Sequence, residues 1–227
     1  MNIQQNKKKK EIKEDPVLEG VLKAKEYISK NSTTLIIAVA AVVVVAVGAV
    51  FYFNAKESSI RKAQEIFGTA MIDYNANQMD KALTAFSDVA NNYRQTPHGV
   101  MSAFMMGSIY MKQGNYDQAI NWFETAVSNK KEAGFVGAQA LEGLAAAYEA
   151  KGDVSSAMKY LQRALEDEQL KFRHSAISWK MALLNQESNA ELSQTLCEKL
   201  ISDTLATEYH QRAQNLLAVL KISKSDS

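Results

Sequence analysis

The chain has 227 residues, 47% of them hydrophobic, and a formal net charge of +1 at pH 7. Its single cysteine, Cys197, excludes an intrachain disulfide in any compartment. The charge divides into +3 before residue 35 and −2 after residue 53. Because the larger part of the chain is slightly acidic, nucleic acid is disfavoured as a partner.

Residues 1–34 form a basic N-terminal segment. Its first part, Met1–Asp15, is polar and lysine-rich and is expected to be disordered. Pro16 then opens a short amphipathic helix, because apolar residues follow helical spacing while the lysines face elsewhere. The apolar set is Val17, Leu18, Val21, Leu22, Ala24 and Ile28, and the lysines are Lys23, Lys25 and Lys30. Two interpretations stay open: a helix that lies on the inner leaflet or on a membrane partner, and a plain positive topology signal.

Residues 35–53, from Leu35 to Phe53, contain no charged or strongly polar side chain. As a helix this stretch would span roughly 28 Å, about the thickness of the hydrocarbon core of a bilayer. A buried globular helix would need a larger core than small repeats supply. A cleaved signal peptide normally has a short basic start and an apolar run of about 7–15 residues. We therefore predict a single transmembrane helix that is retained as a signal-anchor.

The basic residues predict the orientation of this span. Three basic residues lie close to it on each side, so the distal run Lys7–Lys10 breaks the tie. The positive-inside rule then places the N-terminus in the cytoplasm. In a bacterial inner membrane, residues 54–227 would be periplasmic, or extracytoplasmic.

A pattern repeats after the span: Tyr110, Gly114 and Ala119 recur 38 positions later as Tyr148, Gly152 and Ala157. A fixed period in the thirties with small and aromatic residues in register predicts stacked helical hairpins in an all-α fold. Glycine tolerates positive φ and would close each hairpin turn. Asn115 and Asp153 follow these glycines and are suited to cap the second helices.

These residues resemble the tetratricopeptide repeat (TPR), whose pattern has a small residue at position 8, Tyr at 11, Gly at 15, Ala at 20, Phe at 24 and Ala at 27. The unit that starts at Val100 carries Gly107, Tyr110, Gly114, Ala119, Phe123 and Ala126 at these positions. The unit near Ala138 carries Ala145, Tyr148, Gly152, Ala157, Leu161 and Ala164. An earlier unit from Ala63 keeps Ala70, Ala82 and Phe86, with Asn77 in place of the turn glycine. The residues in excess of a standard repeat are expected in loops 94–99 and 131–134.

Further helices are expected to complete a solenoid over residues 54–227. Phe172–Leu184 and Ala190–Ile201 predict a degenerate fourth hairpin, and an amphipathic segment would cap its apolar end. The expected repeats are 63–97, 100–133, 138–171 and the degenerate 172–203, followed by the capping helix 205–222.

The sequence gives no sign of catalysis. His98, His174 and His210 lack metal-ligand spacing, and no phosphate loop, nucleophile elbow or dinucleotide fingerprint occurs. Cys197 falls on a helical stripe of leucines, so it is expected to be a buried apolar residue. We expect a protein that is not an enzyme, with no cofactor, metal or small-molecule substrate.

The TPR resemblance implies that first-helix positions 2, 5, 9 and 12 line a concave groove. In the first two repeats these positions are rich in Met and aromatic residues, which suit adaptable binding of varied proteins. The candidate protein-binding residues are Phe67, Met71, Tyr74, Met101, Phe104, Ser108 and Met111. In the third repeat the same positions hold Gln139, Glu142, Ala146 and Glu149. The alternative is that these Met and Phe side chains belong to the core.

The whole layout resembles YfgM-like proteins, which are TPR-containing ancillary subunits of the bacterial SecYEG translocon. The local match runs from Glu26–Asn31 to Ala63 and then through the repeats. The resemblance implies lateral association with the translocon. It also implies contact with a membrane-anchored periplasmic chaperone, such as a PpiD-like protein, to receive secreted or outer-membrane proteins. The other class considered is an envelope scaffold for cell division or outer-membrane assembly, which lacks support from a lipobox cysteine or heptad run.

Overall fold

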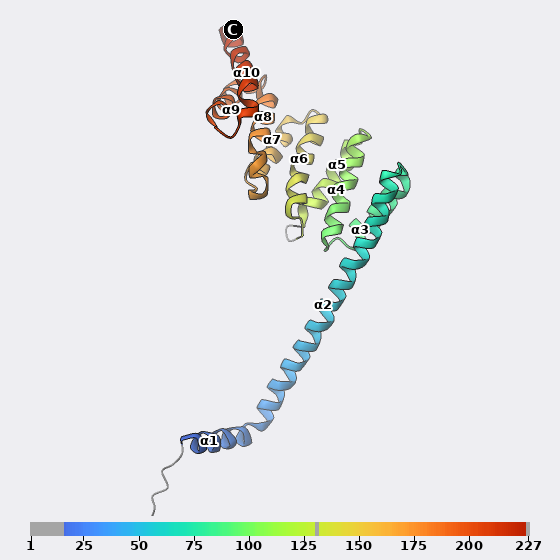
Figure 1. Cartoon of the computed structure of the whole chain (residues 1–227), viewed down its shortest axis with the longest axis vertical. Coiled ribbons are helices and arrows are strands. Elements are labelled where there is room, and N and C mark those ends of the chain that lie inside the picture. Colours follow the sequence, from blue (N-terminus) through green and yellow to red (C-terminus); the bar gives the residue numbers. More distant parts are fainter. Residues whose placement is uncertain (1–15, 130–131, 226–227) are drawn as a thin grey trace, which may run out of the picture. The chain divides into compact units, whose positions relative to one another are not determined.

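The structure is a computed structural model that describes residues 16–129 and 132–225, and the elements of these residues are all helical. The chain divides into two compact units, Met1–Lys56 and Glu57–Ser227 (Figure 1). The expected disorder of Met1–Asp15 concerns residues outside those described.

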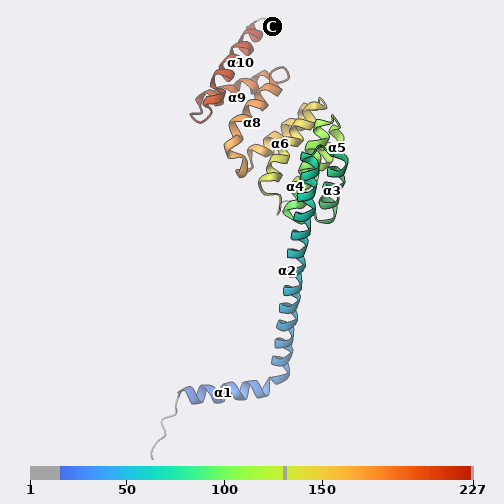
Figure 2. The ribbon, with the colours of Figure 1, turned by 45° about the vertical axis from the view of Figure 1, so that its right-hand side comes forward.

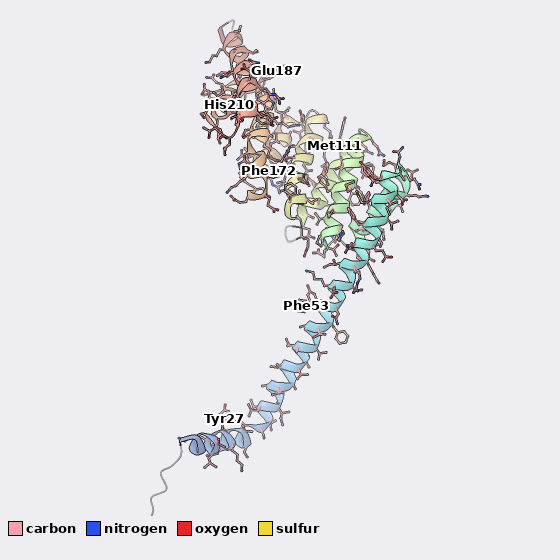
Figure 3. All side chains as sticks on the ribbon, in the orientation of Figure 1. Tyr27, Phe53, Met111, Phe172, Glu187 and His210 are labelled. Atoms are coloured by element: carbon pink, nitrogen blue, oxygen red, sulfur yellow. The ribbon has the colours of Figure 1, made fainter. Side chains whose placement is uncertain are left out.

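The first unit contains α1 (Pro16–Lys30) and the apolar part of α2 (Ser32–Asn75). The most apolar 18-residue window of α2 has a mean hydropathy of 2.9 and none of it is buried. By length and composition, α2 is therefore a candidate membrane span, and the predicted span 35–53 lies inside it. Phe53, at the end of that span, projects from the ribbon with its ring exposed (Figure 3). The residues of α2 from Glu57 onward belong to the second unit.

The second unit continues as a row of helical hairpins (Figure 2). After α2 come α3 (Met79–Asn92), α4 (Pro97–Lys112), α5 (Tyr116–Ser128), α6 (Gly134–Ala150), α7 (Val154–Leu165), the 3-10 helix η1 (Glu168–Arg173), α8 (His174–Asn185), α9 (Ala190–Ser202) and α10 (Thr207–Ser225). From α3 to α10 each α-helix packs against the next, and α4 also packs against α6. This confirms the predicted all-α, TPR-type solenoid.

Three hairpin turns share one backbone geometry. Asn77, Gly114 and Gly152 have φ angles of 58°, 74° and 80°. After each of them, the next amide donates to the carbonyl five residues earlier, from Gln78 to Asp73, Asn115 to Tyr110 and Asp153 to Tyr148, at 2.8–2.9 Å. This bond is typical of a helix end closed by a left-handed residue. The structure confirms the turn role that the sequence predicted for these three positions.

The predicted helix caps also form. The Asn115 side chain accepts a hydrogen bond from the Gln118 amide at 3.4 Å. The Asp153 carboxylate accepts one from the Ser156 amide at 3.0 Å and one from its hydroxyl at 2.6 Å. These bonds lower the pKa of Asp153. Each cap satisfies an amide that the first helical turn leaves without a partner.

Small residues bring the helices into close contact. Ala82, Ala119 and Ala157 occupy the same repeat position and are fully buried. Gly107 of α4 faces the Phe123 ring so closely that an added Cβ would lie 2.6 Å from its Cδ1 atom. The Phe123 ring therefore fills the space that Gly107 leaves free.

Two predicted boundaries were wrong. Pro97, His98 and Gly99 were expected in a loop but form the first turn of α4, because Thr96 caps the Gly99 amide at 3.1 Å and proline is favoured at the first helical position. The helix predicted from Phe172 starts at His174 instead. There Asp167 accepts a bond from the Gln169 amide at 2.9 Å and opens the 3-10 helix η1, which includes Phe172. The predicted loop 131–134 lies partly outside the described residues.

Candidate protein-binding groove

The seven candidate residues lie on two helices, α2 and α4, and every one of them is half-buried. Phe67, Met71 and Tyr74 are on α2, whereas Met101, Phe104, Ser108 and Met111 are on α4. These helices are the first members of consecutive hairpins. The side chain of Met111 marks the C-terminal part of α4 (Figure 3).

The three residues of α2 pack onto a core cluster made of Ala70, Ala82, Phe86, Met106 and Ile109. The ring of Phe67 lies 5.6 Å from that of Phe86 and 5.5 Å from that of His98, measured between centroids. Phe67 therefore helps to hold α2 against α3 and α4 as well as contributing to the surface. This combines the two roles that the sequence analysis had kept apart.

Tyr74 joins α2 to α4 through a contact with Lys112 that was not predicted from the sequence. The Lys112 ammonium donates a hydrogen bond of 2.7 Å to the Tyr74 hydroxyl and lies 5.4 Å from the centroid of its ring. The two residues are 38 positions apart, one more than the 37 that separate equivalent residues of the first two repeats, such as Ala82 and Ala119. The repeat period alone pairs Tyr74 with Met111, so it does not indicate the contact with Lys112.

On α4 the four candidates differ in their environment. Phe104 lies 5.7 Å from Phe123 between ring centroids, and Phe104 and Met111 pack against the larger core cluster. The Ser108 hydroxyl donates to the Phe104 carbonyl at 2.9 Å, so its hydrogen bond is made within the helix. Met101 is half-buried and belongs to neither core cluster. It is thus the candidate with the weakest structural role.

The third repeat presents acidic residues, and the next hairpin pairs them. Glu142 receives two bonds from the Arg173 guanidinium, at 2.6 and 2.9 Å, and Glu149 pairs with Lys180 at 2.5 Å. The bond with Glu142 raises the pKa of Arg173. Both pairs join residues 31 positions apart. The Met and aromatic candidates therefore lie in the first two repeats, whereas ion pairs connect the third repeat to the helices that follow it.

Burial shifts the pKa of two titratable groups, His98 in α4 and Cys197 in α9. Burial lowers the pKa of His98, whose Nδ1 atom is buried without a hydrogen-bond partner. Burial also raises the pKa of the fully buried Cys197 thiol, which opposes formation of the nucleophilic thiolate.

Among the described residues, no group of three or more His, Cys, Asp or Glu is placed to hold a metal ion. What α2 and α4 offer is a half-buried surface of Met and aromatic side chains.

Comparison with known proteins agrees with this architecture. The chain is similar to the protein in a solved structure titled "Crystal structure of MamA protein", with 19% identity and a TM-score of 0.58 over 72% of this chain and 82% of that one. A likeness at this identity shows the fold alone. No curated protein matches the chain. A family model described as a tetratricopeptide repeat-like domain matches residues 25–176, more than half of the sequence. The chain therefore belongs to the tetratricopeptide repeat-like domain family.

Proposed function

We propose that this protein is a non-enzymatic, membrane-anchored scaffold that binds other proteins through the half-buried Met and aromatic side chains of α2 and α4, the groove that the TPR resemblance implies. Residues 35–53 would cross the bacterial inner membrane as its anchor, with residues 1–34 in the cytoplasm and residues 54–227 in the periplasm. The observation that carries the proposal is the gathering of Phe67, Met71, Tyr74, Met101, Phe104 and Met111 on two adjacent first helices, each still partly exposed.

The chemistry of this surface suits partners with exposed apolar segments. Methionine is unbranched and flexible, so it adapts to partners of different shape. Aromatic side chains supply large contact area at low entropic cost. Phe67 and Phe104 are fixed by ring contacts behind the surface. Aromatic rings held by the core, together with flexible methionine side chains on the same helices, can accept varied apolar side chains.

In its finer form, we propose an ancillary role at the SecYEG-type translocon. The support is the resemblance of the layout to YfgM-like proteins, which have a short basic start, one span and a TPR domain. In that role, the groove would receive apolar segments of secreted or outer-membrane proteins as they emerge, together with a PpiD-like membrane-anchored chaperone. Such segments are exposed before folding and match the Met-rich surface chemically.

The test is photocrosslinking in intact membranes, with a photoreactive amino acid placed at Met101 or Met111. The matched control is Asn121, an exposed residue of α5. We expect crosslinks to translocon subunits, the chaperone or translocating proteins from the two groove positions and not from the control. In addition, Met101→Glu should weaken capture at least fivefold, since anchor residues typically contribute more than about 1 kcal/mol.

Two results would contradict the proposal. Crosslinks from Asn121 with none from the groove would move the binding surface to the second helices. Crosslinks confined to proteins of cell division or outer-membrane assembly would retain the groove and replace the translocon role with the envelope-scaffold function.

A further inference from the structure

Helix α1 is amphipathic and leaves its apolar residues uncovered. Val21, Leu22, Tyr27 and Ile28 are each more than half exposed to solvent. Val21, Ala24 and Ile28 follow the spacing i, i+3, i+7, so they share one face of the helix. Glu26, Lys23 and Lys30 fall on the opposite face. An exposed apolar face of this kind needs a covering surface.

The junction with α2 determines what surface is within reach. Only Asn31 separates α1 from α2. The Tyr27 carbonyl accepts bonds from both the backbone and the side-chain amide of Asn31, each at 3.0 Å. The Asn31 carbonyl then accepts the Leu35 amide of α2 at 3.0 Å. If the apolar part of α2 spans a bilayer, this short connection holds α1 at the membrane surface.

The charges favour an anionic lipid surface. Residues 1–34 carry a net charge of +3. Lys25 lies beside the apolar face, where a lysine can bury its alkyl stem and extend its ammonium to the headgroups. Tyr27 stands at the end that meets the junction, and tyrosine is favoured at membrane interfaces. With 15 residues, α1 is also too short to span the hydrocarbon core itself, which needs about 20.

We propose that α1 lies in the headgroup region of the cytoplasmic leaflet, with Val21, Ala24 and Ile28 toward the acyl chains and Lys25, beside that face, on anionic phospholipid headgroups. This inference rests on the proposed membrane anchor. It gives the segment before the span a structural function, because a helix fixed along the membrane surface restricts tilting and sliding of α2.

The experiment uses the full-length chain in protein-free vesicles of phosphatidylglycerol and phosphatidylcholine. Every variant carries Cys197→Ala and one new cysteine labelled with an environment-sensitive fluorophore. Ile28→Cys reports the apolar face of α1, Glu26→Cys its polar face and Val43→Cys the span. We expect lipid-borne quenchers to quench the labels at Ile28 and Val43, and acrylamide in the water to quench the label at Glu26.

The labels distinguish failure of the surface helix from failure of the membrane anchor. Quenching by lipid at Val43, with equal access of acrylamide to Ile28 and Glu26, would overturn the surface helix and leave the anchor intact. Access of acrylamide to Val43 would overturn the anchor itself. If the Ile28 label becomes protected only in cell-derived membranes, the covering surface is a protein, and the lipid proposal fails.

A second arm tests the charge. Replacing Lys25 by Gln should lower the equilibrium constant for binding of α1 to the vesicle surface about fivefold, because a basic residue near an anionic surface contributes about 1 kcal/mol. Lys23→Gln and Lys30→Gln, on the opposite face, should lower it less. The same variants should behave alike in pure phosphatidylcholine. Unchanged docking of all three variants in the anionic vesicles would contradict the proposed headgroup contact.

Discussion

The ring of Phe123 in α5 lies against the bare backbone of Gly143 in α6: a Cβ added at Gly143 would fall 2.7 Å from the Cζ atom of the ring. Gly107 of α4 approaches another edge of the same ring, where an added Cβ would lie 2.6 Å from Cδ1. The ring is only 2% exposed. It is therefore confined by two helices and cannot move away from one without meeting the other.

This confinement predicts that Gly143→Ala destabilises the repeat domain. Alanine normally stabilises a helix relative to glycine, so the matched control is Gly68→Ala, where the new methyl meets nothing within 4 Å. Relative to that control, Gly143→Ala should lower the free energy of unfolding by about 1–3 kcal/mol, the usual cost of overpacking. Denaturant unfolding followed by tryptophan fluorescence measures it, since both tryptophans, Trp122 and Trp179, lie in the repeat domain. Equal stability of the two variants would show that the ring can move.

Asn77 gives a second prediction from backbone geometry. Its φ of 58° is left-handed, as in the glycine turns of the next two repeats. Asn77→Gly should therefore keep or slightly raise the stability of the domain. Asn77→Val should lower it by about 1–2 kcal/mol, because a β-branched residue is strained at positive φ. The same fluorescence experiment measures both, and a valine variant as stable as the glycine variant would contradict the proposed turn.

The hairpin turns could be predicted from the sequence, because a single residue determines the backbone geometry of each turn. Positive φ restricts a position to glycine or asparagine, so Asn77, Gly114 and Gly152 identified the turns directly. The start of α8 could not be predicted in this way, because a capping bond there competes with helical spacing. The apolar pattern extends back to Phe172, but the Asp167 cap makes that residue part of a 3-10 helix, where its side chain is exposed.

The site was less predictable than the fold, because groove and core use the same residue types. Phe67 and Phe104 have the spacing of groove residues, yet both rings also contact buried phenylalanines. The pairs Glu142–Arg173 and Glu149–Lys180 depend on the register between the third hairpin and the degenerate fourth. The repeat pattern does not define that register. Such contacts require the packed helices.

The proposed topology predicts where each end of the protein is found in a bacterial cell. A reporter enzyme that is active only outside the cytoplasm, fused after Ser227, should be active. The mature protein should also retain its lysine-rich N-terminus, as measured by intact mass. An inactive reporter would reverse the orientation, and an N-terminus near Ala49 would replace the anchor with a cleaved signal peptide.

His98 predicts a pH dependence at the edge of the groove. Its imidazole lies 5.5 Å from the Phe67 ring between centroids, at a tilted angle of 54°, and burial lowers its pKa below the ordinary value of 6.5. The unfolded chain therefore binds a proton at a higher pH than the folded one. The contribution of His98 to stability is complete above pH 6.5 and is lost as the pH falls from there toward the lowered pKa.

The measurement is the denaturant midpoint of the full-length chain at pH 7.5 and pH 5.5. The wild type should lose stability between the two, and His98→Gln should lose less, because glutamine stays neutral at both. At pH 7.5 the variant itself should be less stable by about 0.5–1.5 kcal/mol, the usual value of a lost aromatic pair. If His98→Gln loses as much stability as the wild type between the two pH values, the acid sensitivity does not arise from His98.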